Sequence, residues 1–546
     1  MSKVKFYSDS AKTNQVYPEI DLGENLELGL ENYFAITADD GIYGLEFDLW
    51  ATSHTSAGTK TGKNAGQTIT PGTNAVYETS SYGVAFDSYD CNAFVDSDGV
   101  QHITYLKGMP EYGDTEDTIK TYTYNGTTYL QDVFVIKRTY YEKWYNDGTK
   151  QYYERSYIPR DGFTPVAHAI RKDGTVSPWF LTAKYVAGVD SQGRYRSLKG
   201  LAPARYVSGA TGNSATNHPQ SYNNCISNFH ARGTYYTAGL ASEYKDFLTT
   251  FWLKYGTRNT QSIMRGCTDY NYQYQVAAVE ENVSRVKLTT TQAANLVVGS
   301  YVSIGDRGAS GGADRAYGYN HSLADEVKIL SIEEDTEDST YSYVNLDCEP
   351  FTTTATTYLN TMHWISGFSD DVLGRDGCPG NLTNGKFPMV LDGIEMMVGG
   401  YEVAGNAIMD IVSSTGQREV YVTNDSTKLT TTVATIKSTY NKSSYSMQPT
   451  TLNAWNYITA MQLDLANGVA VPTEAGATSS GSSVGYADGL YVDSGTSGQR
   501  EFLLLGSLNR GTDAGLSCLT ADLSLSSAYW HYLARLSINA TGGTLA

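Results

Sequence analysis

The segment SEYKDFLTTFWLKYG, residues 242–256, carries the clearest structural signal in the chain. Six of its apolar side chains are Tyr244, Phe247, Leu248, Phe251, Trp252 and Tyr255. They recur at intervals of three and four residues, which places them in one stripe along a helix. Ser242 is a suitable N-cap and Gly256 a suitable terminator. The pattern therefore predicts a helix that packs an aromatic stripe into a core.

The chain on either side of this segment is mostly strand-like. A shorter helix is expected from Ser221 to Gly233, with Ile226 and Phe229 on its apolar side. Residues 1–150 contain short Tyr, Val, Thr and Ile runs, and Asn125-Gly126 separates two of them, which is a strong hairpin signal.

Residues 281–363 predict a small β module of their own. Evenly spaced strand candidates lie at 286–288, 301–304, 327–332 and 343–346, with a Gly-rich loop at 305–318. The loop contains Gly308-Ala309-Ser310-Gly311-Gly312, which matches Gly-x-Ser-x-Gly in letters. No apolar strand precedes it and no helix pattern follows it, so a catalytic nucleophile is not expected there.

Composition limits the possible functions. A chain of 546 residues is long enough for three or four domains, and its net charge of −19 without a basic stripe disfavours nucleic acid as a partner. Neither a secretory signal nor an apolar run long enough to span a bilayer is visible. The six Cys are scattered singly, which is typical of reduced buried thiols, and the eight His form no metal-ligand cluster. We expect no cofactor, no metal and no membrane insertion.

Several segments, in order, resemble the C-type-lectin-like domains of phage tropism proteins and diversity-generating-retroelement targets. The wider group includes formylglycine-generating-enzyme-like proteins. The matching segments are 165–170, 184–185, 196–200, 393–403, 505–516, 529–530 and 534–537. Two departures are Leu508, where Trp is usual, and Leu533, where Gly precedes Ala-Arg. The copper-binding cysteine pair of the formylglycine enzyme is absent, so its chemistry is not carried over.

The resemblance implies an α+β, β-dominated multidomain fold. A β-rich N-terminal region, residues 1–150, would attach the protein to the virion. Residues 151–280 and 364–546 would form the C-type-lectin-like domain, and residues 281–363 would be a small β-barrel or β-sandwich module inserted into it.

The resemblance also implies a ligand face near the C-terminus. Its candidate residues are Asn509, Arg510, Thr512, Asp513, Ser517, Asp522, Tyr529, His531 and Tyr532. Arg510, Tyr529 and Tyr532 are the expected anchors, since Tyr and Arg dominate many interfaces. The alternative is that these are ordinary loop side chains without a binding role and that Trp530 belongs to the core.

The implied function is that of a phage receptor-binding protein in a tail fibre or tail tip, which is made in the host cytoplasm and adheres without chemistry. Its expected partners are a bacterial surface protein or glycan and other virion proteins, in a homotrimer. One alternative is a head-fibre or capsid decoration protein that uses the same fold for assembly. The other is an enzyme, either one that acts on envelope glycans or a formylglycine-type enzyme.

Overall fold

The computed structural model describes residues 3–4, 20–21, 30, 34, 40–49, 57–72, 86, 88–207, 217–306, 321–371, 375–377, 385–477 and 485–538. Strands dominate these residues, and the fold is a β-rich α+β arrangement of several sheets. The predicted fold class is confirmed at this level. The Gly308–Gly312 motif and Cys378 lie outside the described residues.

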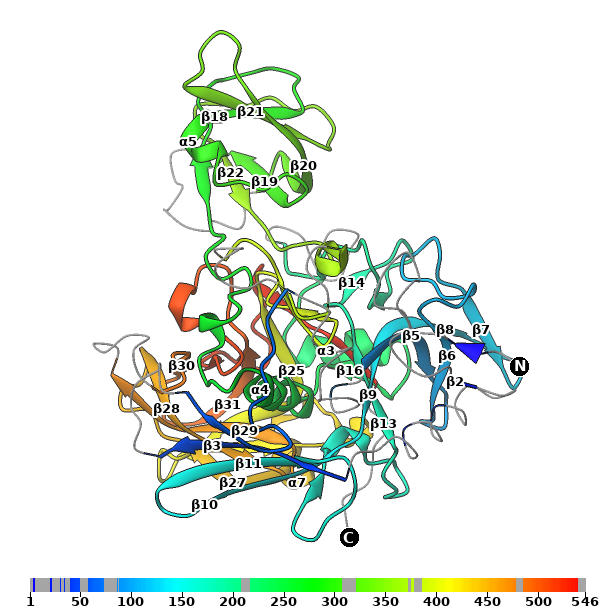
Figure 1. Cartoon of the computed structure of the whole chain (residues 1–546). Helices are drawn as coiled ribbons and strands as arrows, with labels where there is room; N and C mark the ends of the chain where they lie inside the picture. Colours follow the sequence, from blue (N-terminus) through cyan, green and yellow to red (C-terminus); the bar gives the residue numbers. More distant parts are fainter. Residues whose placement is uncertain are drawn as a thin grey trace.

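Three larger sheets build the body of the molecule (Figure 1). The first has the order β12 (Thr164–Pro165), β10 (Tyr141–Asn146), β11 (Lys150–Ser156), β3 (Ile42–Asp48) and β4 (Thr59–Gly62). The second has the order β13 (Trp179–Ala183), β9 (Asp132–Arg138), β5 (Ser88–Val95) and β6 (Gln101–Leu106).

The third sheet is C-terminal and has nine strands. Its order is β27 (Asn441–Met447), β26 (Arg418–Val422), β25 (Tyr401–Ile411), β31 (Gly498–Leu504), β32 (Leu519–Ala521), β30 (Gly489–Val492), β28 (Trp455–Asp464) and β29 (Val469–Ala477). The ninth strand, β33 (Tyr532–Leu533), pairs with β25 in parallel.

Shorter elements connect these sheets. The two-stranded pairs are β1 (Lys3–Val4) with β2 (Ile20–Asp21), β7 (Thr121–Tyr124) with β8 (Thr127–Leu130), β14 (Gly188–Val189) with β15 (Tyr195–Arg196), β16 (Tyr236–Ala238) with β34 (Leu536–Ile538), and β23 (Met389–Leu391) with β24 (Ile394–Met396). The α-helices are α3 (Tyr222–His230), α4 (Ala241–Tyr255), α5 (Thr290–Ala293) and α7 (Val433–Thr439).

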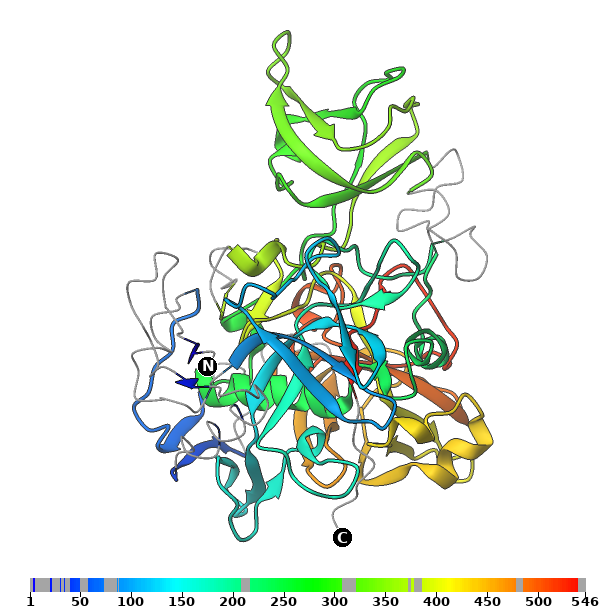
Figure 2. The ribbon, with the colours of Figure 1, turned by 90° about the vertical axis from the view of Figure 1, so that its right-hand side faces the viewer.

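The predicted aromatic helix is α4, and it runs through the centre of the body (Figure 2). Its aromatic stripe enters one hydrophobic core with residues of the first sheet, such as Leu45, and of the C-terminal sheet, such as Val471. Trp252 is fully buried, and its ring centroid lies 5.9 Å from those of Phe47 and Trp144. Gly256 ends the helix in the left-handed conformation, at φ 64°, as the sequence predicts.

The predicted N-cap was wrong, because Ser242 lies inside the first turn. The helix begins earlier because two side chains accept its first backbone N–H groups. Glu243 Oε2 accepts from Leu240 N at 2.7 Å, and Asn406 Oδ1 accepts from Ala241 N at 2.8 Å. Burial raises the pKa of Glu243 to about 7.

The polar side of α4 is buried as completely as its aromatic side. Asp246 lies 2.5 Å from Lys137 Nζ and 3.5 Å from an Arg155 nitrogen, and Lys245 forms an ion pair with Glu142. These partners come from β9, β10 and β11. Because a buried charge without a partner is costly, the pairings fix the helix in the body.

The N-terminal 150 residues do not form a separate unit among the described residues. Residue 150 is the first residue of β11, which pairs with β3 on one side and β10 on the other. Buried side chains of β3 share one core with α4 and the C-terminal sheet. The expected boundary at 150 therefore cuts through a sheet, and the region before it is continuous with the rest of the body.

The inserted segment forms a six-stranded sheet that stands apart from the body on a narrow neck (Figures 1 and 2). The strand order is β17 (Gln273–Gln275), β22 (Thr357–Thr361), β19 (Tyr301–Asp306), β20 (Ala324–Glu334), β21 (Tyr341–Leu346) and β18 (Arg285–Thr289). Its core contains only residues between 274 and 359. The sheet begins at Gln273, earlier than the expected 281, because β17 pairs with the last strand, β22.

Other local patterns behave as the sequence indicates. Asn125 and Gly126 adopt φ 48° and 78° in the turn between β7 and β8. The α3 helix takes Ser221 as its N-cap. The cysteines Cys91, Cys225, Cys267 and Cys518 are buried free thiols. In the described part of the chain, no helix is long and apolar enough to cross a membrane.

The buried ion pairs of α4 make a stability prediction. We expect Asp246→Ala to lower the free energy of unfolding by about 3–5 kcal/mol, because Lys137 and Arg155 would stay buried without their carboxylate. The matched control is Lys428→Ala, which removes an exposed lysine from its pair with the half-buried Asp425 and should cost less than about 1 kcal/mol. Denaturant unfolding compares the two variants. Equal small losses would contradict the assigned role of Asp246.

The buried carboxyl group of Glu243 makes a pH prediction. Its pKa is raised to about 7 in the folded protein. The group therefore contributes stability that is fully present below its pKa in the unfolded chain and is lost as the pH rises through about 7. Glu243→Gln keeps the acceptor for Leu240 N but carries no charge. We expect the free energy of unfolding of the variant, relative to that of the parent protein, to rise by about 2–3 kcal/mol between pH 4.5 and pH 8. A difference that does not change with pH would contradict this.

The neck makes a prediction about the module. Thr361 N donates to Tyr272 O at 3.0 Å, so the segment that enters the module and the segment that leaves it lie side by side. We expect a short Gly-Ser linker in place of residues 274–359 to leave the body folded and cooperative in thermal melting. A loss of about 1–3 kcal/mol is expected, because Arg205 loses Asp325 and Glu326 and because Tyr301 no longer covers the buried cluster that contains Trp530. A non-cooperative or aggregated product would show that the body needs the module.

Candidate functional site

The candidate ligand residues lie on the segment 509–532, which follows β31 and contributes β32 and the first residue of β33 to the C-terminal sheet. Their exposure differs widely. Thr512 is exposed, whereas Asn509, Arg510, Asp513, Asp522, Tyr529 and His531 are half-buried, and Ser517 and Tyr532 are buried. The predicted residues therefore do not form one continuous exposed surface.

Tyr532 and Ser517 cannot serve as ligand contacts in this conformation, which corrects two of the predicted residues. Tyr532 is only 3% exposed because β33 pairs with β25 and its ring packs edge-on against Tyr401 at 6.1 Å. Ser517 N donates to Asp488 Oδ2 at 2.8 Å beneath the surface. Neither side chain reaches solvent enough to meet a partner.

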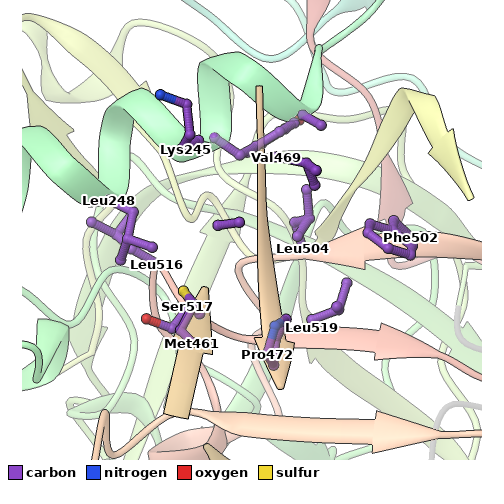
Figure 3. A pocket seen from close by; sticks show the side chains of 13 residues that line it. Lys245, Leu248, Met461, Val469, Pro472, Phe502, Leu504, Leu516, Ser517 and Leu519 are labelled. Carbon is purple, nitrogen blue, oxygen red and sulfur yellow. The ribbon is translucent and has the colours of Figure 1, made fainter. Parts of the chain in front are cut away.

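Ser517 also lines a small, partly open cavity between α4 and the C-terminal sheet (Figure 3). The other lining residues are almost all apolar: Ala241, Tyr244, Leu248, Met461, Val469, Ala470, Pro472, Phe502, Leu504, Leu516 and Leu519, together with Lys245. The nitrogen of Lys245 points away from the neighbouring labelled side chains and meets Glu142. A volume of about 30 Å³ has room for about two water molecules, so the cavity is a packing defect and not a substrate pocket.

An open group of side chains surrounds Arg510. We name it the tryptophan–arginine patch and define it as Trp455, Tyr491, Arg510 and Asp522, all half-buried. The Arg510 guanidinium lies 5.0 Å from the Trp455 ring centroid, which is cation–π range. Trp455 and Tyr491 are directly opposite each other on β28 and β30, with ring centroids 5.4 Å apart. Strand pairing thus fixes both rings beside the cation.

Polar groups of the patch are available to a ligand. The Trp455 indole N–H and the Tyr491 hydroxyl form no hydrogen bond with any residue in the described part of the chain. Asp522 follows β32, next to β30, and burial raises its pKa, while the nearby Arg510 opposes the shift. The patch therefore combines two aromatic rings, a guanidinium, a carboxyl group and two vacant donors.

Asp513 and Thr512 lie beside the patch but are occupied internally. Tyr457 donates its hydroxyl hydrogen to Asp513 Oδ1 at 2.8 Å and lies 3.3 Å from the Thr512 hydroxyl. Burial raises the pKa of Asp513. These two residues support the loop that carries Arg510 and need not contact a ligand themselves.

The remaining predicted residues lie toward the neck of the module. Trp530 is buried with Leu508 and Met362, and Tyr301 of the module packs on this group. Its ring centroid is 5.2 Å from that of the buried His363, while His531 is adjacent and half-buried. Tyr529 stacks on His531 at 6.0 Å. This part of the predicted face is largely a packing contact that supports the module.

Sequence reasoning missed Trp455 and Tyr491. The available signal was a tryptophan in the stretch 450–456, which is rich in Thr and Asn, but nothing in the spacing connects it with Arg510, which is 55 positions away. Within the described ranges, no group of three His, Cys, Asp or Glu side chains is arranged to hold a metal ion.

A comparison of the sequence with protein-family models finds no match, and a comparison with curated proteins finds none either.

Proposed function

We propose that this chain is a phage virion protein that binds a bacterial surface receptor through the tryptophan–arginine patch. The observation that carries the proposal is the half-exposed Trp455–Arg510 pair, held beside Tyr491 on paired strands. Tryptophan, tyrosine and arginine are the residue types that most often dominate binding energy at protein interfaces. Other virion proteins, a homotrimeric state and attachment through the N-terminal region belong to the same proposal and remain predictions.

The rigidity of the patch supports a binding role. Trp455 and Tyr491 have few rotatable bonds and sit on neighbouring strands of a nine-stranded sheet. Little conformational entropy is therefore lost when a partner covers them. A rigid aromatic surface with a guanidinium and a carboxyl group at its edge suits either a protein epitope or the hydroxyl-rich rim and C–H face of a sugar.

The charge of the chain is compatible with this role. A net charge of −19 disfavours nucleic acid as the partner and favours solubility of a particle component. A structural role in assembly, as a head fibre or decoration protein, remains the competing proposal, and an enzyme of envelope glycans is the second.

Alanine substitutions in the patch test the proposal. We expect Trp455→Ala and Arg510→Ala each to weaken adsorption of the purified protein to host cells by about 2 kcal/mol, roughly 30-fold in Kd. Folding should be retained, because neither side chain is fully buried. The matched control is Arg285→Ala, which removes a similar cation–π pair with Tyr343 at 3.9 Å on the module. That variant should adsorb normally.

Thermal melting and adsorption are measured on all three variants. Normal adsorption of folded Trp455→Ala and Arg510→Ala would place the receptor contact elsewhere. If the parent protein does not adsorb, and the patch variants instead fail to join particles, the assembly role is favoured. Turnover of an envelope glycan by the parent protein would favour the enzyme.

A further inference from the structure

A lysine and two aspartates meet in the interior at the C-terminal end of α4. Lys254 is the last residue but one of the helix, Asp392 lies in the turn between β23 and β24, and Asp376 belongs to the short segment 375–377. The side chains of Lys254 and Asp376 are fully buried, and that of Asp392 is 1% exposed. All three are thus removed from water.

Their atoms are arranged for reaction as well as for pairing. Lys254 Nζ is in direct contact with Asp392 Oδ1 and lies 3.0 Å from Asp376 Oδ2 and 3.3 Å from its Oδ1. Asp392 N donates to Asp376 Oδ1 at 2.7 Å, and the Tyr255 hydroxyl donates to Asp376 Oδ2 at 3.0 Å. Asp376 therefore contacts both the amine and the backbone of the residue that the amine touches.

The backbone holds Asp392 in this position. Asp392 and Gly393 adopt φ 54° and 79°, the left-handed region that a tight turn requires. A Cβ on Gly393 would lie only 2.5 Å from the Arg375 guanidinium, so the turn has no room to shift toward that side. Arg375 also donates to Asp392 O at 2.9 Å, so the turn that carries the Asp392 carboxyl group is held beside Lys254.

We propose that Lys254 and Asp392 form an intramolecular isopeptide bond, with Asp376 as the group that relays the proton. In water an ammonium and a carboxylate do not condense, because both are stabilised as ions. Inside the protein the stabilisation by water is lost, although Lys254 and Lys137 still lower the pKa of Asp392. Two groups held in contact react as if at very high concentration. Burial raises the pKa of Asp376, which favours its role as a proton carrier.

The step balances without any further reagent. The Lys254 Nζ lone pair attacks Cγ of Asp392, forming the N–C bond, and one C–O bond of the carboxyl group breaks. The ammonium gives up two protons, one of them through Asp376, and the departing oxygen takes both and leaves as water. Asp376 returns to its starting state, and the ammonium–carboxylate pair becomes a neutral amide.

Three other buried lysines, Lys137, Lys184 and Lys245, also contact carboxylates. Lys245 is equally buried and in contact with Glu142, but among the described residues no second carboxylate lies within ion-pair distance of it. Lys137 contacts Asp246 and Asp392, at 2.5 and 3.0 Å. Lys184 lies 2.7 Å from Asp90 Oδ2 and 3.0 Å from Asp370 Oδ1. Neighbouring cations lower the pKa of Asp246 and of Asp90, whereas burial raises the pKa of Asp376, the proposed proton carrier beside Lys254. The reaction is therefore assigned to Lys254.

Mass spectrometry of the full chain under denaturing conditions tests the cross-link. We expect the parent protein to weigh one water molecule less than its sequence requires, and Asp392→Ala and Asp376→Asn to have their full sequence masses. The Asp376→Asn variant keeps both bond-forming residues, so its full mass would identify the relay. Lys245→Met is the matched control and should keep the deficit of the parent protein.

Proteolytic digestion locates the bond. A branched peptide that joins the segment around Lys254 to the one around Asp392 is expected from the parent protein and from Lys245→Met. A parent protein of full sequence mass would overturn the proposal, and so would a branch at Lys137 or Lys245. A deficit that persists in Asp376→Asn would overturn the relay role. These readouts do not depend on receptor binding, and the mass of the parent protein does not require any variant to fold.

Discussion

The burial of charge on α4 is the constraint on which the rest of the body depends. Because both sides of the helix are removed from water, the charges of Lys245, Asp246 and Lys254 must be paired with other groups of the protein. The partners come from β9, β10 and β11 and from the turn between β23 and β24. Each of these pairings joins parts of the chain that are about 100 residues or more apart. The sheets therefore assemble around the helix as one unit.

The sequence predicted the aromatic side of α4 because an apolar stripe is a local pattern. It could not predict that the polar side is also buried, since Lys245, Asp246 and Lys254 look like a solvated face when their partners are unknown. The same limit explains the boundary at 150, which falls in a sheet whose strands β3 and β11 are far apart in sequence. Strand pairing over such distances leaves no local signature.

The ligand face shows the same division between local and distant information. Arg510 lies in an open position, but Tyr532 does not, because β33 pairs with β25 about 130 residues earlier in the chain. Trp455 reaches Arg510 through the register of β28 with β30, which the sequence does not reveal. Trp530 was expected in the core and is buried there, where it also supports the module through Tyr301.

The position of Arg535 has a consequence for synthesis of the protein. Its guanidinium forms two hydrogen bonds with Glu402, at 2.9 and 3.1 Å, and donates to the backbone oxygens of Ala183 and Glu395. Translation proceeds from the N-terminus, and N-terminal domains usually fold before the rest is made. Here β13 and β25 receive a shared buried partner only after Arg535, 352 residues beyond Ala183, has left the ribosome. The core of the body therefore cannot be completed on the ribosome before this distant residue has been made.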